Sequence, residues 1–228
     1  MKKTLLATTL LAALTATSAQ ASTLIGLKVG GDYWQPDTKG QVSFDGNTGG
    51  SYDYDSSAQG SLWVALEHPI PLVPNVMIRE TRISEKVNNG AENARANLSN
   101  TDFIGYYEIL DNDLVSLDLG AAYKLMHGSH SATDVIKQDL DDGTFMGYAD
   151  AKVGVPGLGL FGFATVMTGI DESKVYDYSI GLGWQFEGMA LDYRLRAGYR
   201  DFNYDANNSG INADLSSKGY FAGVEIAF

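Results

Sequence analysis

The chain has 228 residues, with 16 basic and 28 acidic side chains, a net charge of −12, 44% hydrophobic residues and no cysteine. Its 13 Tyr, 9 Phe and 3 Trp residues can bury enough area to offset the ordering entropy, which excludes a disordered chain. The net negative charge repels the phosphate backbone of nucleic acids, and no basic cluster is evident in the sequence. We therefore expect no nucleic-acid partner. Without cysteine, disulfides, thiolate nucleophiles and Cys-ligated metals are excluded.

The first 21 residues have the pattern of a secretory signal peptide. Lys2 and Lys3 precede an apolar run from Leu5 to about Ala16, and Ala19-Gln20-Ala21 supplies the small residues that a signal peptidase accepts. A transmembrane anchor would need about 20 apolar residues, and this run is shorter and interrupted by threonines. We therefore predict cleavage after Ala21, which leaves a mature chain of residues 22–228.

Period-two alternation runs through the mature chain and predicts β-strands of the length that crosses an outer membrane. Tyr178, Ile180 and Leu182, for example, share a face opposite Asp177, Ser179 and Gly181. Two segments resist assignment: either phase of 75–84 puts a charge outward, so we expect a bulge there, and 160–170 is apolar on both faces. The predicted strands are 25–34, 57–67, 75–84, 102–109, 115–126, 145–154, 160–170, 176–186, 191–200 and 219–228.

Ten strands are an even number, as single-chain bacterial barrels have, and the connectors alternate in length. Tight turns rich in Pro, Gly, Asn or Asp are expected at 69–74, 111–113, 156–159 and 187–189. Longer polar loops are expected at 35–56, 85–100, 128–143 and 205–216, with a brief one near 171–174. Short periplasmic turns and long external loops are typical of outer-membrane barrels, and both termini would then be periplasmic.

A soluble all-β barrel would also alternate, but would bury its apolar face and expose its polar one. The apolar side chains of ten strands do not obviously fit inside such a barrel. Aromatic residues also concentrate near strand ends, as interfacial girdles require: Tyr33, Tyr123, Tyr176, Tyr178, Trp184, Phe186, Tyr199, Tyr220 and Phe228. The sequence therefore predicts an all-β, ten-stranded antiparallel transmembrane barrel in a Gram-negative outer membrane, with an eight-stranded barrel as the alternative.

The last strand resembles the C-terminal signature of Gram-negative outer-membrane proteins, which is a final Phe preceded by apolar residues at alternate positions. The resemblance implies an assembly signal, read by the barrel-assembly machinery, in Tyr220, Ala222, Val224, Ile226 and Phe228. More narrowly, residues 68–75, Tyr176-Asp177-Tyr178, Gly198-Tyr199-Arg200 and Gly223 are similar to a family of small, functionally uncharacterised outer-membrane β-barrel proteins. The resemblance assigns no catalytic residue to this chain, because none is established for that family.

The strand phases place many ionisable side chains inside the barrel, where charges must be paired or hydrated. One interpretation is a narrow wet pathway that sorts ions; the other is a salt-bridge network that fills the lumen and holds it shut, as in the smallest barrels. Bulky Trp34, Trp63, Tyr106 and Tyr148 would narrow any passage. Besides Asp102, the predicted lumen charge network comprises Lys28, Asp32, Glu67, Glu108, Asp118, Lys124, Asp150, Lys152, Asp177, Asp192, Arg194, Arg196, Arg200 and Glu225.

No catalytic, metal or cofactor site is predicted. Catalysis needs converging groups from several strands, whereas His127 and His130 cluster with serines and aspartates in one loop and His68 lies apart. A hydrolase is therefore the less favoured class. The acidic loops lack the complete spacing of a calcium site. We expect a monomer in contact with outer-membrane lipid and lipopolysaccharide, with a structural or surface-binding role through its loops, or alternatively a narrow channel for small solutes or ions.

Overall fold

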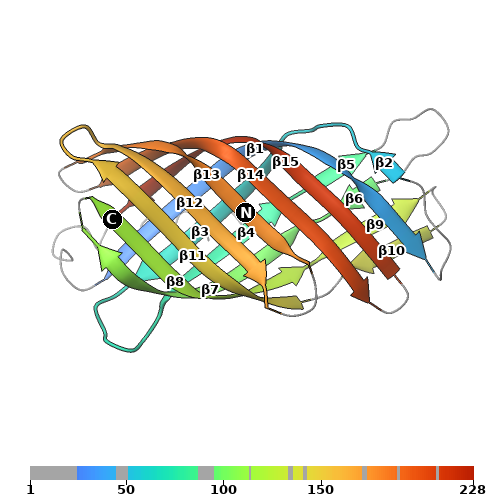
Figure 1. Cartoon of the computed structure of the whole chain (residues 1–228), viewed down its shortest axis with the longest axis horizontal. Helices are drawn as coiled ribbons and strands as arrows, with labels where there is room; N and C mark the ends of the chain where they lie inside the picture. The colour runs from blue at the N-terminus through green and yellow to red at the C-terminus, as the bar shows by residue number, and fades with distance from the viewer. Residues whose placement is uncertain are drawn as a thin grey trace, which may run out of the picture.

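The structure is a computed structural model that describes residues 25–44, 51–86, 95–112, 114–132, 136–140, 143–170, 174–188, 191–208 and 211–228. The predicted signal peptide, residues 1–21, lies outside this range. Within it, no helix is long and apolar enough to cross a membrane. The chain forms a closed antiparallel barrel, seen from the side in Figure 1.

Fifteen strands occur in the described residues. They are β1 (Gly26–Phe44), β2 (Ser51–Asp53), β3 (Gln59–Glu67), β4 (Asn75–Arg82), β5 (Ser84–Lys86), β6 (Arg95–Asn97), β7 (Asn100–Asp111), β8 (Val115–Met126), β9 (Gly128–Ala132), β10 (Ile136–Leu140), β11 (Gly143–Val155), β12 (Leu160–Gly169), β13 (Tyr176–Phe186), β14 (Asp192–Asn208) and β15 (Ile211–Ala227).

Ten of these strands make the barrel wall. They follow one another in the order β1, β3, β4, β7, β8, β11, β12, β13, β14 and β15, and β15 pairs with β1 from Lys28↔Ala227 to Phe44↔Ile211. Closure leaves the wall without a free edge, so the backbone groups of every wall strand have partners. The predicted ten-stranded antiparallel barrel is confirmed, and the eight-stranded alternative is wrong.

The two ends of the barrel differ. At one end, which we call the turn end, short connections join β3 to β4, β7 to β8, β11 to β12 and β13 to β14, and Ile25 and Phe228 lie there too (left in Figure 1). At the other, the extended end, the distal halves of β1, β14 and β15 continue beyond the neighbouring strands together with β2 and a four-stranded sheet ordered β10-β9-β6-β5.

The four-stranded sheet continues the barrel wall in the same register. Thr81 pairs with Asn100 where β4 meets β7, and three residues further on Ser84 pairs with Asn97 where β5 meets β6. The strands are interrupted only briefly, at Ile83 for example, whose carbonyl oxygen still accepts a backbone hydrogen bond from the Leu98 N–H. The extended end is therefore built from the strands that cross the barrel.

Four of the predicted loops need correction. Residues 35–44 and 205–216 were expected in loops, but they lie largely in β1, β14 and β15. The predicted loops 85–100 and 128–143 contain β5, β6, β9 and β10. Beyond the membrane the outward side chains are polar, which hides the strand pattern, while inward apolar residues such as Phe202 and Leu215 continue the alternation.

The bulge expected in 75–84 is also wrong. β4 pairs without interruption with both β3 and β7, and the register shift lies instead between Glu108 and Leu110, where β7 meets β8. In β4 the odd residues face inward, so Arg79 points into the barrel while Glu80 and Arg82 face outward. In β12, which is apolar on both faces, Phe161, Phe163 and Met167 take the inward side.

The outside of the barrel is apolar at alternate positions around the whole wall. Leu62, Ile78, Ile180, Leu182 and Leu195 are each at least half exposed. The buried ionised side chains, such as Asp102, Lys124 and Asp177, lie on the inward face instead, which excludes the soluble barrel considered from the sequence. A soluble protein would bury this surface rather than present it to solvent.

Two rings of aromatic side chains bound the apolar surface. The ring nearer the extended end includes the pairs Tyr199–Tyr220, Tyr123–Phe145 and Tyr176–Tyr178, with ring centroids 5.3, 4.9 and 4.7 Å apart. The ring at the turn end includes Trp184 and Phe186, 4.6 Å apart. From Tyr176 to Phe186 the strand runs about 33 Å, or about 23 Å in height at a tilt of about 45°, which matches the apolar band of an outer-membrane barrel.

The backbones of β7 and β8 approach each other closely at Gly120, and a substitution there tests this contact. A Cβ at Gly120 would lie 2.1 Å from the carbonyl oxygen of Gly105, whereas a Cβ at Gly147 would meet nothing nearer than 3.9 Å. We expect Gly120→Ala to lower the free energy of unfolding by about 1–3 kcal/mol and Gly147→Ala to change it far less. Urea titration of the folded barrel in detergent micelles measures both; equal effects would contradict the close approach.

Candidate functional site

The middle of the lumen is filled by five ionised side chains. Asp177 of β13 accepts two hydrogen bonds from Arg200 of β14, at 2.8 and 2.7 Å, and one from Arg79 Nη2 of β4 at 2.9 Å. Arg79 Nε also donates to Asp102 Oδ2 at 2.9 Å, and Lys124 Nζ lies 2.7 Å from Asp102 Oδ1. We call this set, Arg79, Asp102, Lys124, Asp177 and Arg200, the ion layer.

The ion layer is dry and held from several strands. The side chains of Asp102 and Lys124 are fully buried, and those of Asp177 and Arg200 nearly so. Lys124 Nζ also donates to Asn100 Oδ1 at 2.9 Å and lies 5.2 Å from the ring centre of Phe202. Since buried charges are costly unless paired, these interactions fix the five side chains in one arrangement across the barrel.

Above the ion layer, toward the extended end, the lumen is closed a second time by apolar side chains. Seven of them are at most 1% exposed. We call this set the apolar layer: Ile83, Leu98, Met126, Met146, Met167, Phe202 and Leu215. Methionine fills irregular gaps well, and Met167 Sδ accepts a hydrogen bond from Arg79 at 2.9 Å, which joins the two layers.

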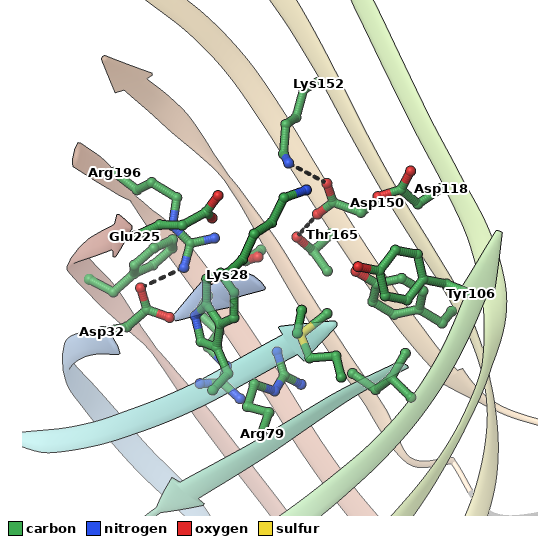
Figure 2. A pocket seen from close by; sticks show the side chains of 18 of the residues that line it. Lys28, Asp32, Arg79, Tyr106, Asp118, Asp150, Lys152, Thr165, Arg196 and Glu225 are labelled. Carbon is green, nitrogen blue, oxygen red and sulfur yellow. Dashed lines mark hydrogen bonds and ion pairs between the residues drawn. The ribbon is translucent and has the colours of Figure 1, made fainter. Parts of the chain in front are cut away.

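Below the ion layer, toward the turn end, lies a cavity of about 70 Å³, enough for about five water molecules. Figure 2 shows the side chains that line it, among them Arg196 paired with Asp32 and Lys152 beside Asp150. Arg196 Nη2 lies 2.8 Å from Asp32 Oδ1, and Thr165 donates to Asp150 at 2.6 Å. Lys152, at 24% exposed, and Lys28, at 20%, show that the cavity opens toward the turn end.

The structure brings most of the predicted lumen residues together. Nine line the cavity: Lys28, Asp32, Glu67, Asp118, Asp150, Lys152, Arg196, Arg200 and Glu225. Lys28 pairs with Glu67, which also accepts a hydrogen bond from Tyr106, and Arg194 pairs with Glu225. Lys124 and Asp177 belong to the ion layer.

Two predicted members lie where strands end. Glu108 is exposed at the end of β7, where the register shifts, but it still interacts with Lys28 and Glu67 of the network. Asp192 accepts a hydrogen bond from the backbone N–H of Gly188 in the turn between β13 and β14. Strand phase alone could not separate Asp192 from the other inward residues, because it lies where β14 begins.

Arg79, which joins both carboxylates of the ion layer, was missed in the sequence. The alternation of Val76 and Ile78 against Asn75, Met77 and Arg79 carries the correct phase. Glu80 and Arg82 obscured it, since both lie outward but above the apolar band, where the outside of the barrel is polar.

The extended end holds a buried carboxyl group. Glu85 of β5 is 1% exposed, in a part of the wall beyond the aromatic ring and so outside the membrane-spanning segments. Burial raises the pKa of Glu85 to about 7, and polar groups of Thr38 and Ser57 offset part of this shift. The nearby hydroxyls of Thr38 and Ser217 bond to each other at 2.7 Å.

The histidines do not converge with other reactive groups in the described residues. His127 lies on the outer surface, where its Nε2 is 3.1 Å from Thr101 Oγ1 and 3.5 Å from Glu80 Oε2. His68 lies in the connection at the turn end, with its Nε2 3.2 Å from the carbonyl oxygen of Pro74. No group of three or more His, Asp or Glu side chains that could hold a metal ion is found in the part of the chain that the structure describes.

Comparison with known proteins gives only distant similarity. No protein-family model matches the chain, and no curated protein sequence matches it. Among solved structures, the chain is similar to the outer membrane protease OmpT from Escherichia coli, with a TM-score of 0.47 and 13% identity over 93% of this chain and 100% of that one. The translocator domain of the autotransporter NalP from Neisseria meningitidis gives 0.45 and 13%, over 99% and 95%.

A third similar structure is Ail, the attachment invasion locus protein of Yersinia pestis, with a TM-score of 0.37 and 14% identity over 90% of this chain and 100% of that one. At these scores no residue of this chain can be matched to a functional residue of the others. The closed wall, the apolar exterior and the two aromatic rings decide the class of protein. The chain is an outer-membrane β-barrel.

The ion layer generates a prediction about stability. Removing one partner of a buried ion pair costs about 3–5 kcal/mol, because the remaining charge is left uncompensated. We expect Asp177→Asn, which leaves three cations around one carboxylate, to lower the free energy of unfolding by about that amount, measured by urea titration in micelles. Asp192→Asn is the matched control, since Asp192 lies outside the network, and a similar loss in both variants would contradict the role of the ion layer.

Glu85 generates a prediction about pH. Its pKa in the folded barrel, about 7, lies above its ordinary value of 4.5, so the folded state binds the proton more tightly than the unfolded state. The contribution of Glu85 to stability is therefore greatest below pH 4.5 and is lost as the pH rises through about 7. We expect Glu85→Gln to flatten this part of the profile, measured as the free energy of unfolding from pH 4 to pH 8. An unchanged slope would show that other groups cause it.

Proposed function

We propose that this chain is a closed outer-membrane barrel with a structural or surface-binding role, and that its extended end is the contact surface. The observation that carries the proposal is the double closure of the lumen. The ion layer fills the middle of the barrel, and the apolar layer above it is at most 1% exposed. Water and ions would have to displace both layers to cross.

The arrangement of the two ends supports an orientation. Outer-membrane barrels keep short turns on the periplasmic side and longer structures outside. The turn end would then face the periplasm, and the extended end, with its additional strands β2, β5, β6, β9 and β10, would stand above the outer surface. Polar and charged side chains such as Asp37, Lys39 and Asp201 cover the outward face there, as a water-exposed surface requires.

A narrow channel is the second candidate function. The observation in its favour is the cavity at the turn end, whose lining carries both signs of charge. The cavity is blind, however, because the ion layer closes it from above. For ions to pass, the three cations of the ion layer would have to break their contacts with Asp102 and Asp177 at the same time.

The remaining parts of the proposal concern chemistry, assembly and oligomeric state. We propose no enzymatic activity, since the described histidines lie far apart, at the turn end and on the outer surface. Tyr220, Ala222, Val224, Ile226 and Phe228 lie on the outward face of β15, where the barrel-assembly machinery could read them, and we propose that they serve as the assembly signal. We propose a monomer, because the wall closes within one chain.

Conductance tests the closed barrel. We expect the purified full-length protein, reconstituted into planar lipid bilayers, to show no steady openings, because both layers block the lumen. A porin reconstituted in the same bilayers confirms that the recording detects open barrels. Steady openings whose size shifts in Arg196→Ala or Arg200→Ala, but not in Lys218→Gln on the outer surface, would overturn the proposal and favour the channel.

A further inference from the structure

The outward face of β4 and β5 carries two basic side chains, Arg82 and Lys86, that have no acidic partner among the described residues. Arg82 and Lys86 are both exposed and point outward, four residues apart along the continued strand. Among the described residues, neither makes an ion pair or a side-chain hydrogen bond. The backbone partner of Lys86 is a third basic residue, Arg95 of β6. We call Arg82 and Lys86 the basic pair.

The other basic side chains that the structure describes on this rim are paired. Lys218 lies 3.0 Å from Asp201, Lys174 lies 3.5 Å from Asp205, and Lys39 lies within 4 Å of two aspartates. His127 is held by Glu80 and Thr101. The chain has a net charge of −12. Two neighbouring basic side chains without an ion pair among the described residues therefore distinguish this part of the surface.

The position of the basic pair defines what can lie against it. Directly below it on the same face, Ile78 of β4 and Leu62 of β3 are more than half exposed and belong to the apolar band that contacts hydrocarbon. Arg82 is four residues above Ile78, which is about 13 Å along the strand and about 9 Å in height at a tilt of about 45°. The layer next to the hydrocarbon at this height is that of the lipid headgroups.

Access to the basic pair is open. The residue opposite Arg82 on β3 is Gly60, which has no side chain to cover the guanidinium group. Glu80, the nearest carboxylate below on β4, is engaged by Thr101 at 2.6 Å. The backbone N–H of Asp55 donates to the carbonyl oxygen of Lys86 at 3.0 Å, and no ion pair joins the side chains of these two described residues. Arginine matches phosphate oxygens in a bidentate geometry, and lysine adds a point charge.

The geometry points to a binding site for a phosphate-bearing glycolipid of the outer leaflet, held by Arg82 and Lys86 against the apolar surface of Leu62 and Ile78. The acyl chains lie along β3 and β4, and the headgroup phosphates contact the basic pair above them. The two side chains stand at different heights, so they fit a headgroup with phosphates at more than one depth. This site would fix one lipid at β4 and β5 of an otherwise acidic rim.

The test measures the affinity of the full-length protein in detergent micelles for fluorescently labelled lipopolysaccharide, at about 150 mM salt. Each basic side chain near an anionic lipid surface contributes about fivefold. We expect Arg82→Gln/Lys86→Gln to bind about 30-fold more weakly than the wild type. The control Lys39→Gln/Lys218→Gln removes the same charge elsewhere on the rim, and screening over a Debye length of about 8 Å should limit its loss to about threefold.

The source of the phosphate is tested with the same protein. We expect enzymatically dephosphorylated lipopolysaccharide to bind the wild type as weakly as the native lipid binds the double variant, and inorganic phosphate at 10 mM not to displace the native lipid. Retained affinity in the double variant, equal loss in the control, tight binding of the dephosphorylated lipid, or displacement by inorganic phosphate would each overturn the proposal. Heat-dependent gel migration confirms that every variant is folded.

Discussion

The pairing of β15 with β1 is the contact on which the rest of the molecule depends. In hydrocarbon there is no water to satisfy a free strand edge, so a sheet that crosses a membrane must close. Seventeen consecutive residue pairs, from Lys28↔Ala227 to Phe44↔Ile211, make that closure. Once the wall is closed, each strand has one face toward lipid and one toward the lumen, and every other property of the barrel follows from which side chains take each face.

The relation between the two faces reverses at the aromatic ring near the extended end. Below it, the outward face is apolar and the ionised side chains lie on the inward face, as Leu195 and Arg196 illustrate on β14. Above it, the outward face is polar and large apolar side chains lie inward, as do Phe202 and Tyr204 of β14. The solvent outside changes from lipid to water at this height, so the upper part of the wall is built like a soluble β-structure on the same strands.

This reversal explains how much could be predicted from the sequence. Most of the ten crossing strands were predictable because an apolar outward face and a polar inward face alternate along their length, and the exceptions were 75–84 and 160–170. The sequence pattern predicts loops for the extensions of β1, β14 and β15, because polar outward residues such as Lys218 and Asp201 interrupt the alternation of apolar side chains. Arg79 was missed for the same reason. Glu80 and Arg82 face outward above the aromatic ring, where the outer surface is polar, whereas Val76 and Ile78 face outward below it, where the outer surface is apolar.

The candidate site was predictable in composition but not in pairing. Inward phase is a property of one strand, so Asp177 and Arg200 could be placed inside from their own segments. The partners of Asp177 come from β4 and β14, and Arg79 is 98 residues away in the chain. Only closure of the wall brings these strands across from each other, and no local pattern records it. Asp192, at the start of β14, shares the phase of the inward residues but accepts its hydrogen bond from the neighbouring turn.

The unbroken register from β4 into β5 has a mechanical consequence. With no linker or hinge between the barrel and the sheet above it, Ser84↔Asn97 is fixed in height and rotation by Thr81↔Asn100. A molecule that docks on the extended end would pull directly on hydrogen-bonded strands anchored in the bilayer, and the load would be shared along their length. The four-stranded sheet at the extended end is therefore held at a fixed angle to the membrane plane.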